Sequence, residues 1–466
     1  MSDTSATATA VILAAGKGTR MKCDHPKVLH TAAGRTLIDW VLGAVSESGI
    51  DRTAVVLGHQ SESVGAGLSG EVEQVVQAPQ NGTGHAVAVA LEHLEGLGEG
   101  ATVVIGYADM PLVPAAVYRR LARREPGTAA VMATVDPGPP GYGRIIRDGS
   151  GRVTGIVEER DCSPEQAAIS ERNAGLYGFD ARLIARALGQ IEDDNTQGEL
   201  YLTDVIALLA EAGERIETFA VDPADVVGVN SHDELAEVEA VCRRRINREL
   251  MEAGVWMLDP VRTYIDVTAR VAPGAVIYPG TYLLGSTSVG AGATVGPDTF
   301  VVDSVVGPDA RVWYSVVRSA RIGPEANVGP FASLRPGTVL DRGAKAGTFV
   351  ETKNTRVGEG AKVPHLSYMG DAEIGRGANV GAGTITCNYD GVDKHRTVIG
   401  ERAFIGSDTM LVAPVTVGDD AVTGAGSVIT SDVEPGALAV ERSTQKQVSG
   451  YAERRAQRRR EPGEGT

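Results

Sequence analysis

The sequence predicts an α/β domain with a largely parallel sheet, followed by a parallel β-helix of hexapeptide repeats. Up to about residue 230, runs that are apolar throughout alternate with stretches of helical spacing, the pattern of strands buried between helices. From Val271 onward, aliphatic residues recur every six positions with glycine and small residues between them, which indicates a parallel β-helix. The 466 residues suffice for two or three domains.

Residues 1–230 form the expected α/β domain. Its apolar runs cover residues 10–15, 53–57, 101–105 and 128–135, and its helical stretches cover residues 36–48 and 85–94. Residues 231–262 are expected to be a helical arm between the domains. Apolar residues keep helical spacing there from Leu235 to Leu250, and Gly254 can end the helix.

Residues 263–450 carry the hexapeptide repeat. Each repeat supplies one short strand and a tight corner, where glycine permits a positive φ. The inward-pointing residues form three runs in a six-residue step: Val271, Ile277, Leu283, Val289, Val295 and Val301; Ile322, Val328, Leu334 and Leu340; and Ile399, Ile405, Leu411 and Val417. Residues 365–371 and 387–396 break this phase, and we expect both to be loops inserted on one face of the solenoid, often the binding face.

Composition argues against several classes of partner. The formal charge of −16 disfavours general nucleic-acid binding, which needs a basic footprint. No apolar run is long enough for a membrane span or a signal core. The four scattered cysteines fit free thiols in a reducing cytoplasm. We therefore expect a soluble cytoplasmic protein with no nucleic-acid or membrane partner, ending in a disordered basic tail over residues 451–466.

Two glycine-rich segments indicate phosphate chemistry in the first domain. Residues 13–21 follow the first expected strand, and residues 82–86 open an expected helix after Gln77. Their backbone N–H groups can cradle phosphates, although neither segment has the Walker spacing. Asp109 follows another apolar strand, where a carboxylate can hold a metal ion beside phosphates. Positive charge is added by Lys17, Arg20 and Lys27.

These segments resemble the nucleotidyltransferases that join a nucleoside triphosphate to a sugar 1-phosphate, above all through residues 13–21 and Pro26-Lys27-Val28-Leu29. From about Val11 to Tyr451, the chain resembles the bacterial family of bifunctional N-acetylglucosamine-1-phosphate uridylyltransferase/glucosamine-1-phosphate N-acetyltransferases. The resemblance implies a Rossmann-like α/β nucleotidyltransferase domain followed by a left-handed parallel β-helix of hexapeptide repeats. It also implies a homotrimer with acetyl-CoA bound between neighbours.

The resemblance assigns residues of the first domain to three roles. Those that match the UTP site are Leu13, Ala14, Gly16, Lys27, Gln77, Gly82 and Thr83. Asp109 and Asn230 match the Mg²⁺ ligands. The residues that match the site of N-acetylglucosamine 1-phosphate are Gly143, Glu158 and Asn173. Ala108 departs from the glycine usual in the family, and its methyl group could crowd the sugar or the base.

The resemblance also places a second active site in the β-helix, with His365 as the catalytic base. The residues that match the site of glucosamine 1-phosphate are Arg335, Lys353, Tyr368 and Asn379, with Lys394 reaching from the inserted segment. Those that match the acetyl-CoA site are Ala382, Asn388, Tyr389, Ser407, Ala425 and Arg442.

Elementary chemistry suits both assignments. Uridylyl transfer uses a phosphate oxygen that is already anionic, so it needs Mg²⁺ and cations rather than a general base. An amine that attacks a thioester must lose a proton, and an unperturbed histidine titrates near pH ~6.5. Asn388 and Ser407 are both candidates for the donor to the developing oxyanion. His395 is interpreted as a solvated loop residue.

Two alternatives are open. In the first, the β-helix serves only as an oligomerisation or regulatory module of a sugar-1-phosphate nucleotidyltransferase. The inserted segments with His365 and Asn388 argue against it, because a scaffold does not need them. In the second, the chain is a sugar-nucleotide-binding sensor with a decayed site. That alternative requires the loss of Lys27, Asp109 or Asn230, and all three are present.

Overall fold

The computed structural model describes residues 7–16 and 18–460. The chain divides into two compact units, which are described separately. Unit 1 comprises Met1–Arg248 and Ile265–Thr268, and unit 2 comprises Glu249–Tyr264 and Ala269–Thr466. The division runs through α8 (His232–Glu252), whose buried residues Val238, Cys242 and Ile246 keep the predicted helical spacing.

Unit 1 is built on a nine-stranded sheet in the order β11-β7-β10-β6-β1-β4-β5, in which β8 also pairs with β10 and β9 pairs with β8. Its strands are β1 (Ala8–Ala14), β4 (Arg52–Leu57), β5 (Glu73–Val76), β6 (Thr102–Tyr107), β7 (Thr128–Val135), β8 (Arg144–Arg147), β9 (Val153–Val157), β10 (Arg172–Asp180) and β11 (Arg215–Ala220). The central strand β1 is parallel to β4 and β6, and β7 is parallel to β11. Strand β10 runs antiparallel between β6 and β7. A small separate sheet pairs β2 (Thr31–Ala32) with β3 (Arg35–Thr36).

Helices cover both faces of this sheet, so the predicted α/β class is confirmed. One core packs α3 (Thr83–His93), α6 (Ala181–Leu188) and α7 (Asp204–Glu211) on one face. The other core packs α1 (Leu37–Glu47), α2 (Ser61–Ala66) and α4 (Ala115–Ala122) on the opposite face. The fully apolar strands result from this arrangement, because each of their faces is buried. The short helix α5 (Pro164–Ala167) lies outside both cores.

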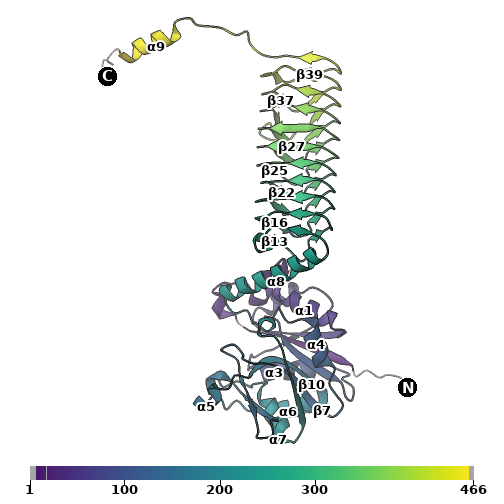
Figure 1. Cartoon of the computed structure of the whole chain (residues 1–466), viewed down its shortest axis with the longest axis vertical. Coiled ribbons are helices and arrows are strands. Elements are labelled where there is room, and N and C mark those ends of the chain that lie inside the picture. The colour runs from purple at the N-terminus through teal and green to yellow at the C-terminus, as the bar shows by residue number, and fades with distance from the viewer. Residues whose placement is uncertain (1–6, 17, 461–466) are drawn as a thin grey trace, which may run out of the picture. The chain divides into compact units, whose positions relative to one another are not determined.

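Unit 2 is a parallel β-helix whose coils contribute strands to three sheets (Figure 1). The first sheet contains β12 (Trp256–Met257), β15 (Val276–Ile277), β18 (Thr294–Val295), β21 (Arg311–Val312), β24 (Asn327–Val328), β27 (Lys345–Thr348), β30 (Lys362–His365), β33 (Asn379–Val380), β36 (Phe404–Ile405), β39 (Val422–Thr423) and β41 (Leu438–Ala439). The second contains β13 (Thr263–Ile265), β16 (Thr281–Leu284), β19 (Phe300–Val302), β22 (Val316–Arg318), β25 (Ser333–Leu334), β28 (Glu351–Lys353), β31 (Tyr368–Gly370), β34 (Ile385–Cys387), β37 (Met410–Val412) and β40 (Val428–Ile429). The third contains β14 (Arg270–Val271), β17 (Ser288–Val289), β20 (Val305–Val306), β23 (Arg321–Ile322), β26 (Val339–Leu340), β29 (Arg356–Val357), β32 (Ala372–Ile374), β35 (Thr397–Ile399) and β38 (Val415–Val417).

The predicted hexapeptide residues all lie inside the coils. Every member of the three sequence runs is buried, from Val271 at 8% exposed to Val417 at 0%. Each step of six residues moves the chain from one sheet to the next, so that the same side of each strand faces the axis. The aliphatic column forms the core of the unit.

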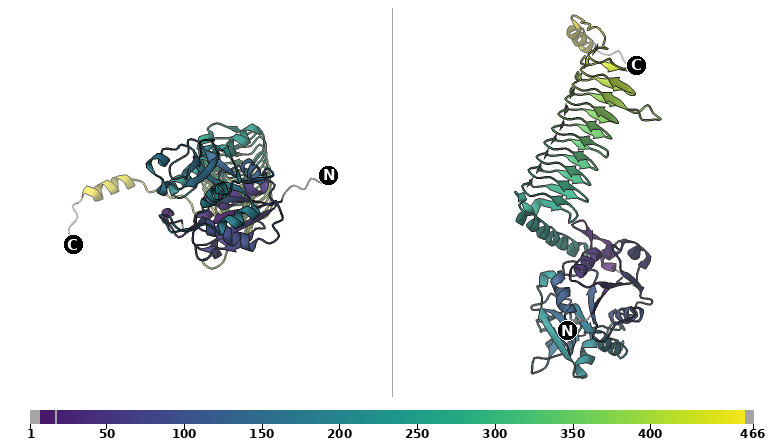
Figure 2. Two further views of the ribbon diagram at one scale, coloured as in Figure 1. Left: turned by 90° about the horizontal axis from the view of Figure 1, so that it is seen from below. Right: turned by 90° about the vertical axis from the view of Figure 1, so that its right-hand side faces the viewer.

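The two expected insertions differ from each other. The expectation of an inserted loop at 365–371 is wrong, since Val363, Met369 and Ile374 are all buried in β30, β31 and β32. One corner there is shortened by a residue, which shifts the phase without adding a loop. Between β34 and β35, by contrast, residues 388–396 do form an inserted loop, closed by a bridge between Tyr389 and Lys394. This loop projects from the stacked coils in Figure 2, right.

The end of the chain differs from the disordered tail expected from the sequence. Helix α9 covers Tyr451–Arg460, and its side chains are exposed over residues 451–458. Alanine, glutamine, glutamate and arginine are strong helix formers, so this segment can be helical without a buried face. Residues 461–466 lie outside the described residues. Within the described part of the chain, no helix combines the length and the apolar character needed to cross a membrane.

Candidate active sites

A cleft of about 420 Å³ lies in unit 1 at the carboxyl edge of its sheet. Strands β1 and β6 are parallel neighbours with Leu13 paired to Tyr107, so the glycine-rich turn after β1 and Asp109 after β6 lie at the same edge. Eight residues predicted from the sequence line the cleft: Leu13, Ala14, Gly16, Lys27, Gln77, Gly82, Thr83 and Asp109. Val28, from the Pro26–Leu29 motif, also lines the cleft, and three lining residues that the sequence analysis missed are Gln80, Tyr107 and Glu199.

The second glycine loop is held against residues 199–200. Gly82 has φ +98°, and a Cβ atom there would lie 2.6 Å from the carbonyl oxygen of Leu200. The Gly84 N–H donates to that carbonyl at 2.8 Å, and Gln77 Nε2 donates to the Gly82 carbonyl at 3.0 Å. Only glycine fits this close approach. The contact explains how Glu199, remote in sequence, comes to line the cleft.

Lys27, Asp109 and Asn230 meet at one point. The Lys27 ammonium makes an ion pair with the Asp109 carboxylate and donates to Asn230 Oδ1 at 3.2 Å. The Lys27 side chain is 11% exposed and that of Asp109 is 22% exposed. A carboxylate and an amide oxygen that converge on a cation are also suitable ligands for Mg²⁺, which binds one or two protein oxygens and completes its shell with water and phosphate. The residues present therefore fit the metal. Among the described residues, no group of three His, Cys, Asp or Glu side chains could hold a metal ion by itself.

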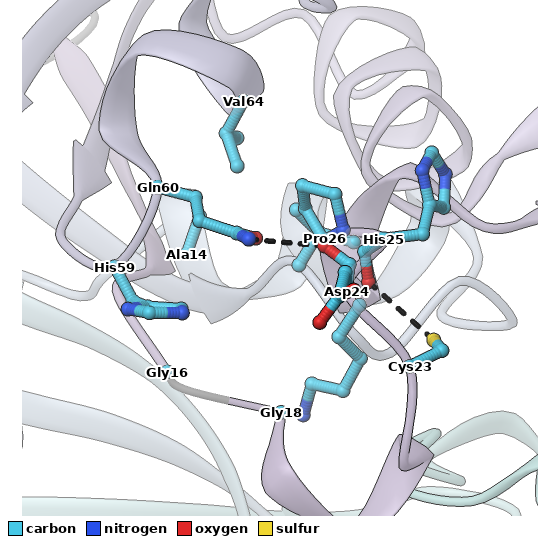
Figure 3. A pocket seen from close by; sticks show the side chains of 12 residues that line it. Ala14, Gly16, Gly18, Cys23, Asp24, His25, Pro26, His59, Gln60 and Val64 are labelled. Atoms are coloured by element: carbon cyan, nitrogen blue, oxygen red, sulfur yellow. Dashed lines mark hydrogen bonds between the residues drawn. The ribbon is translucent and has the colours of Figure 1, made fainter.

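The segment that carries Lys27 is fixed by a neighbouring turn (Figure 3). Gln60 Nε2 donates to the Asp24 carbonyl at 3.0 Å across a small pocket of about 80 Å³. The next turn of chain, Lys27–Leu29, is a 3₁₀ helix. Gly18 has φ +59°, and a Cβ atom there would come within 2.9 Å of Lys27 Cβ. Lys17, another cation expected in this region, lies outside the described residues.

The residues expected to hold the sugar are also close to one another. The Asn173 N–H donates to the Gly143 carbonyl at 2.9 Å, and a Cβ atom on Gly143 would lie 3.6 Å from Glu158 Oε2. Thr203 Oγ1 donates to Glu158 Oε1 at 3.1 Å. Burial raises the pKa of Glu158, with smaller contributions from the nearby carboxylates of Asp204 and Asp161.

Tyr107 links these residues to the cleft. A Cβ atom on Gly175 would approach its ring to 3.1 Å. Burial raises the pKa of Tyr107, and the negative charges of Glu158 and Asp109 act in the same direction. Tyr107 therefore lies near both carboxylates. The sequence carried no signal for this role, because the residue reads as the last position of an apolar strand.

The methyl group of Ala108 does not face the cleft. Ala108 is 0% exposed and belongs to the core on the α1 and α4 side of the sheet. The expected crowding of the sugar or the base is therefore wrong. Tyr107, the last residue of β6, lines the cleft, whereas Ala108 begins the turn that follows and is buried in the core.

In unit 2, His365 and the residues expected to bind acetyl-CoA form a ladder along one corner of the coils. The His365 carbonyl accepts from Gly383 N at 3.4 Å, and the Ala382 carbonyl accepts from Asp408 N at 2.7 Å. The Ser407 carbonyl accepts from Gly426 N at 2.8 Å. At the end of the ladder, Arg442 Nη1 donates to the Ala425 carbonyl at 3.0 Å. Residues up to 77 positions apart in sequence thus share one edge.

Positive charge collects at the next corner of the coils, where strands of the second sheet end. The neighbouring Lys394 ammonium, together with burial, lowers the pKa of Lys353, and the charge of Arg335 acts in the same direction. Arg335 Nη1 donates to Glu351 Oε1 at 2.9 Å. Lys353 lies in β28 and Tyr368 lies in the adjacent strand β31. This cluster of cations is suited to holding a phosphate.

Asn379, Asn388 and Tyr389 lie in different settings. Asn379 lies in β33 and pairs with Lys362 of β30, the strand that ends at His365. Asn388 is 7% exposed, and a Cβ atom on Gly370 would lie 2.7 Å from its Nδ2 and 2.5 Å from Tyr368 Oη. Tyr389 is 59% exposed, and its hydroxyl donates to the Gly391 carbonyl within the inserted loop at 2.6 Å.

His395 lies in the inserted loop, as expected, and it is partly exposed. His395 Nε2 lies 2.7 Å from Asp390 Oδ2, and the side chain of His395 is 32% exposed. The hydrogen bond from His395 lowers the pKa of Asp390. His395 lines a cavity of about 460 Å³ together with Asp371, Lys394 and Arg396. The inserted loop therefore forms part of a pocket wall.

Comparison with known proteins covers nearly the whole chain. A family model described as the MobA-like NTP transferase domain matches residues 10–184, and one described as bacterial transferase hexapeptide (six repeats) matches residues 396–431. The chain is 49% identical to the bifunctional protein GlmU of Streptomyces avermitilis, covering 96% of this chain and 94% of that protein. It is also 49% identical to the Thermobifida fusca protein of the same name, with the same shares covered. Identity to the Carboxydothermus hydrogenoformans protein is 46%, over 95% of this chain and 99% of that protein.

These matches extend over both units and both candidate sites, and the resemblance seen in the sequence is confirmed. The chain belongs to the GlmU family of bifunctional proteins.

Proposed function

We propose that unit 2 transfers the acetyl group of acetyl-CoA to glucosamine 1-phosphate, and that unit 1 joins the resulting N-acetylglucosamine 1-phosphate to UTP and releases pyrophosphate. One observation carries this proposal. The residues expected for each substrate gather in two separate places, a cleft at the carboxyl edge of the sheet in unit 1 and two neighbouring corners of the β-helix in unit 2. A β-helix that served only as a scaffold would not need the cluster of cations and the inserted loop together.

In unit 1, the attacking group is a sugar phosphate oxygen that is already anionic. The obstacle is repulsion between anions, so the site needs positive charge rather than a base. Lys27 supplies charge at the sheet edge, and the backbone N–H groups of the glycine loops can bind phosphate oxygens. Asp109 and Asn230 would hold Mg²⁺, which supplies further neutralisation when bound. Gly143, Glu158 and Asn173 would orient the sugar.

In unit 2, the amine of glucosamine 1-phosphate attacks the thioester carbonyl carbon. His365 accepts the proton that the amine loses, the carbon–sulfur bond breaks, and CoA leaves as a thiolate that then takes up a proton. Arg335, Lys353 and Lys394 would hold the sugar phosphate, with Tyr368 and Asn379 on the sugar. The corner from Ala382 to Arg442 would hold acetyl-CoA, with Ser407 and Ala425 between them and with Asn388 and Tyr389 near the reacting centre.

A homotrimer is part of the proposal, and an exposed apolar edge supports it. Tyr314, Phe331, Phe349 and Leu366 occupy the same corner as His365 and are 40–62% exposed. All four have φ between 45° and 59°, a costly conformation for bulky residues. The rings of Phe331 and Phe349 stack at 5.4 Å. A continuous apolar edge beside the active corner fits contact with a second copy of the chain. The free thiols and small substrates support a cytoplasmic location.

The proposal is tested by mass spectrometry of the purified protein with glucosamine 1-phosphate, acetyl-CoA, UTP and Mg²⁺, with UTP omitted from a parallel reaction. We expect UDP-N-acetylglucosamine in the first tube and N-acetylglucosamine 1-phosphate in the second. If neither tube contains acetylated product while pre-acetylated sugar is uridylylated, the β-helix is only a module of a nucleotidyltransferase.

A further inference from the structure

Asp371 is an ionisable residue beside the second site to which the resemblance gives no role. It follows β31 at the corner that leads to β32, with φ +50°. Its N–H donates to the Lys353 carbonyl at 3.0 Å, and its own carbonyl accepts from Thr397 N at 3.2 Å. Asp371 thus connects the strand that carries Lys353 with the chain that leaves the inserted loop. Its short polar side chain tolerates the left-handed conformation.

Both carboxylate oxygens of Asp371 accept a hydrogen bond from an amide. Asn354 Nδ2 donates to Oδ1 at 2.7 Å, and Asn388 Nδ2 donates to Oδ2 at 2.6 Å. A carboxylate can only accept, so the nitrogen of the Asn388 amide, and not its oxygen, must face Asp371. No donor among the described residues is bonded to Asn388 Oδ1. The contact therefore leaves the amide oxygen as the group that Asn388 can offer to a substrate.

The charges around Asp371 favour its ionised form. Burial acts to raise its pKa, but the hydrogen bonds from Asn354 and Asn388 and the charges of Lys353 and Lys394 outweigh burial and hold the pKa below its usual value. The same carboxylate offsets part of the repulsion between the Lys353 and Lys394 ammonium groups.

We propose that Asp371 is a positioning residue for acetyl transfer, acting through Asn388. The inference rests on the proposed function. Asp371 holds the Asn388 amide so that its oxygen accepts a hydrogen bond from the attacking amine. Asn388 and Ser407 were the two candidates for the donor to the developing oxyanion. Because the Asn388 nitrogen already donates to Asp371, that donor is Ser407 or a backbone N–H group. Asp371 does not touch the reacting atoms.

The test uses the full-length chain with Asp371→Asn, which keeps the size of the side chain and its tolerance of a positive φ. We expect kcat of acetyl transfer to fall about 10²-fold, the usual cost of misplacing a reacting group by about an ångström. The KM for glucosamine 1-phosphate should stay unchanged or fall, because a negative charge beside Lys353 and Lys394 has been removed. A purely structural role would instead raise KM or lower the melting temperature of the β-helix.

A matched control is available at the same corner. Asp303 also has a positive φ (+48°), and its carboxylate accepts from Ser286 N at 2.9 Å, several coils from the site. Asp303→Asn makes the same chemical change and should leave acetyl transfer within about twofold of the unaltered chain. Melting followed by circular dichroism serves as the control for folding of the β-helix in each variant, and uridylyl transfer reports on unit 1.

A double-mutant cycle tests the route through Asn388. Asn388→Ala alone should lower kcat about as much as Asp371→Asn does. When Asn388 is already alanine, adding Asp371→Asn should lower kcat by less than about threefold further. Additive losses would overturn the proposal. An Asn388→Ala variant with full acetyl transfer would also overturn the proposal, and this test does not depend on whether the Asp371→Asn variant folds. If the unaltered chain shows no acetyl transfer, the proposed function fails before this inference is reached.

Discussion

His365 is exposed at the end of β30, on the corner shared with the residues expected to bind acetyl-CoA. We predict that His365→Ala lowers acetyl transfer by about two to four orders of magnitude, the usual contribution of a general base. Uridylyl transfer should be unchanged, because its residues belong to unit 1. Separate assays of the two half-reactions check this, with His93→Ala, at an exposed histidine outside both sites, as the histidine control. A parallel loss of both activities would show that the two sites are not independent.

Glu158 is expected to bind the sugar at a cost in stability. Its pKa is raised by burial, so the unfolded state ionises this group more readily than the folded state does. Ionisation of Glu158 therefore lowers the free energy of unfolding. This loss of stability is absent at pH values below the ordinary pKa of 4.5, grows as the pH rises towards the pKa of the folded state, and is fully present above the folded pKa.

We therefore predict that Glu158→Gln raises the melting temperature of unit 1 at pH 7 and that this gain vanishes near pH 4. The KM for N-acetylglucosamine 1-phosphate should rise in the same variant. Calorimetry at the two pH values, together with uridylyl-transfer kinetics, measures both effects. A variant that is less stable at pH 7 would show that the hydrogen bond from Thr203 outweighs the burial cost.

At the scale of an element, the inserted loop is separable from the coil that carries it. Strands β34 and β35 continue the stacked sheets on either side of residues 388–396. We predict that replacing residues 389–395 with a short glycine-containing corner preserves the β-helix, since no member of the buried aliphatic column is removed. Acetyl transfer should fall at least about 10²-fold, because Lys394 is lost and Asn388 is displaced.

Circular dichroism melting and the two activity assays check this prediction. Val392→Ala is a mild control, because that side chain lies in the same loop and is 83% exposed. Retained acetyl transfer after the replacement would show that the inserted loop is not part of the acetyltransferase site.

At the scale of the whole molecule, the apolar edge beside His365 predicts self-association. Phe331→Glu combined with Phe349→Glu places two charges on adjacent exposed rings of that edge. We expect this variant to be monomeric by size-exclusion chromatography with light scattering, and to lose acetyl transfer while keeping uridylyl transfer. Val305→Glu, on the third sheet, should remain a trimer with both activities. If the double variant is still a trimer, the contact between copies of the chain does not involve this apolar edge.

Much of the fold follows from local pattern. The aliphatic column from Val271 to Val417 was predictable because each step of six residues buries one side chain by a purely local rule. The α/β sheet was predictable because its strands are apolar on both faces. The missed features depend on neighbours in space. A one-residue shortening of a corner and an inserted loop both break the phase in the sequence, and only the strands on either side distinguish them.

The sequence by itself determined the two-part architecture, the hexapeptide core and, through resemblance, the residues expected at both sites. The tertiary structure decided what those residues meet. The backbone of Leu200 lies against Gly82. Tyr107 lines the cleft, while Ala108 is buried in the core. The Asn388 amide donates to the Asp371 carboxylate, which fixes its orientation. The physical reason is that periodicity and motifs report on contacts within a turn or a strand. Hydrogen bonds between distant segments depend on how the strands are ordered and in what register they pair.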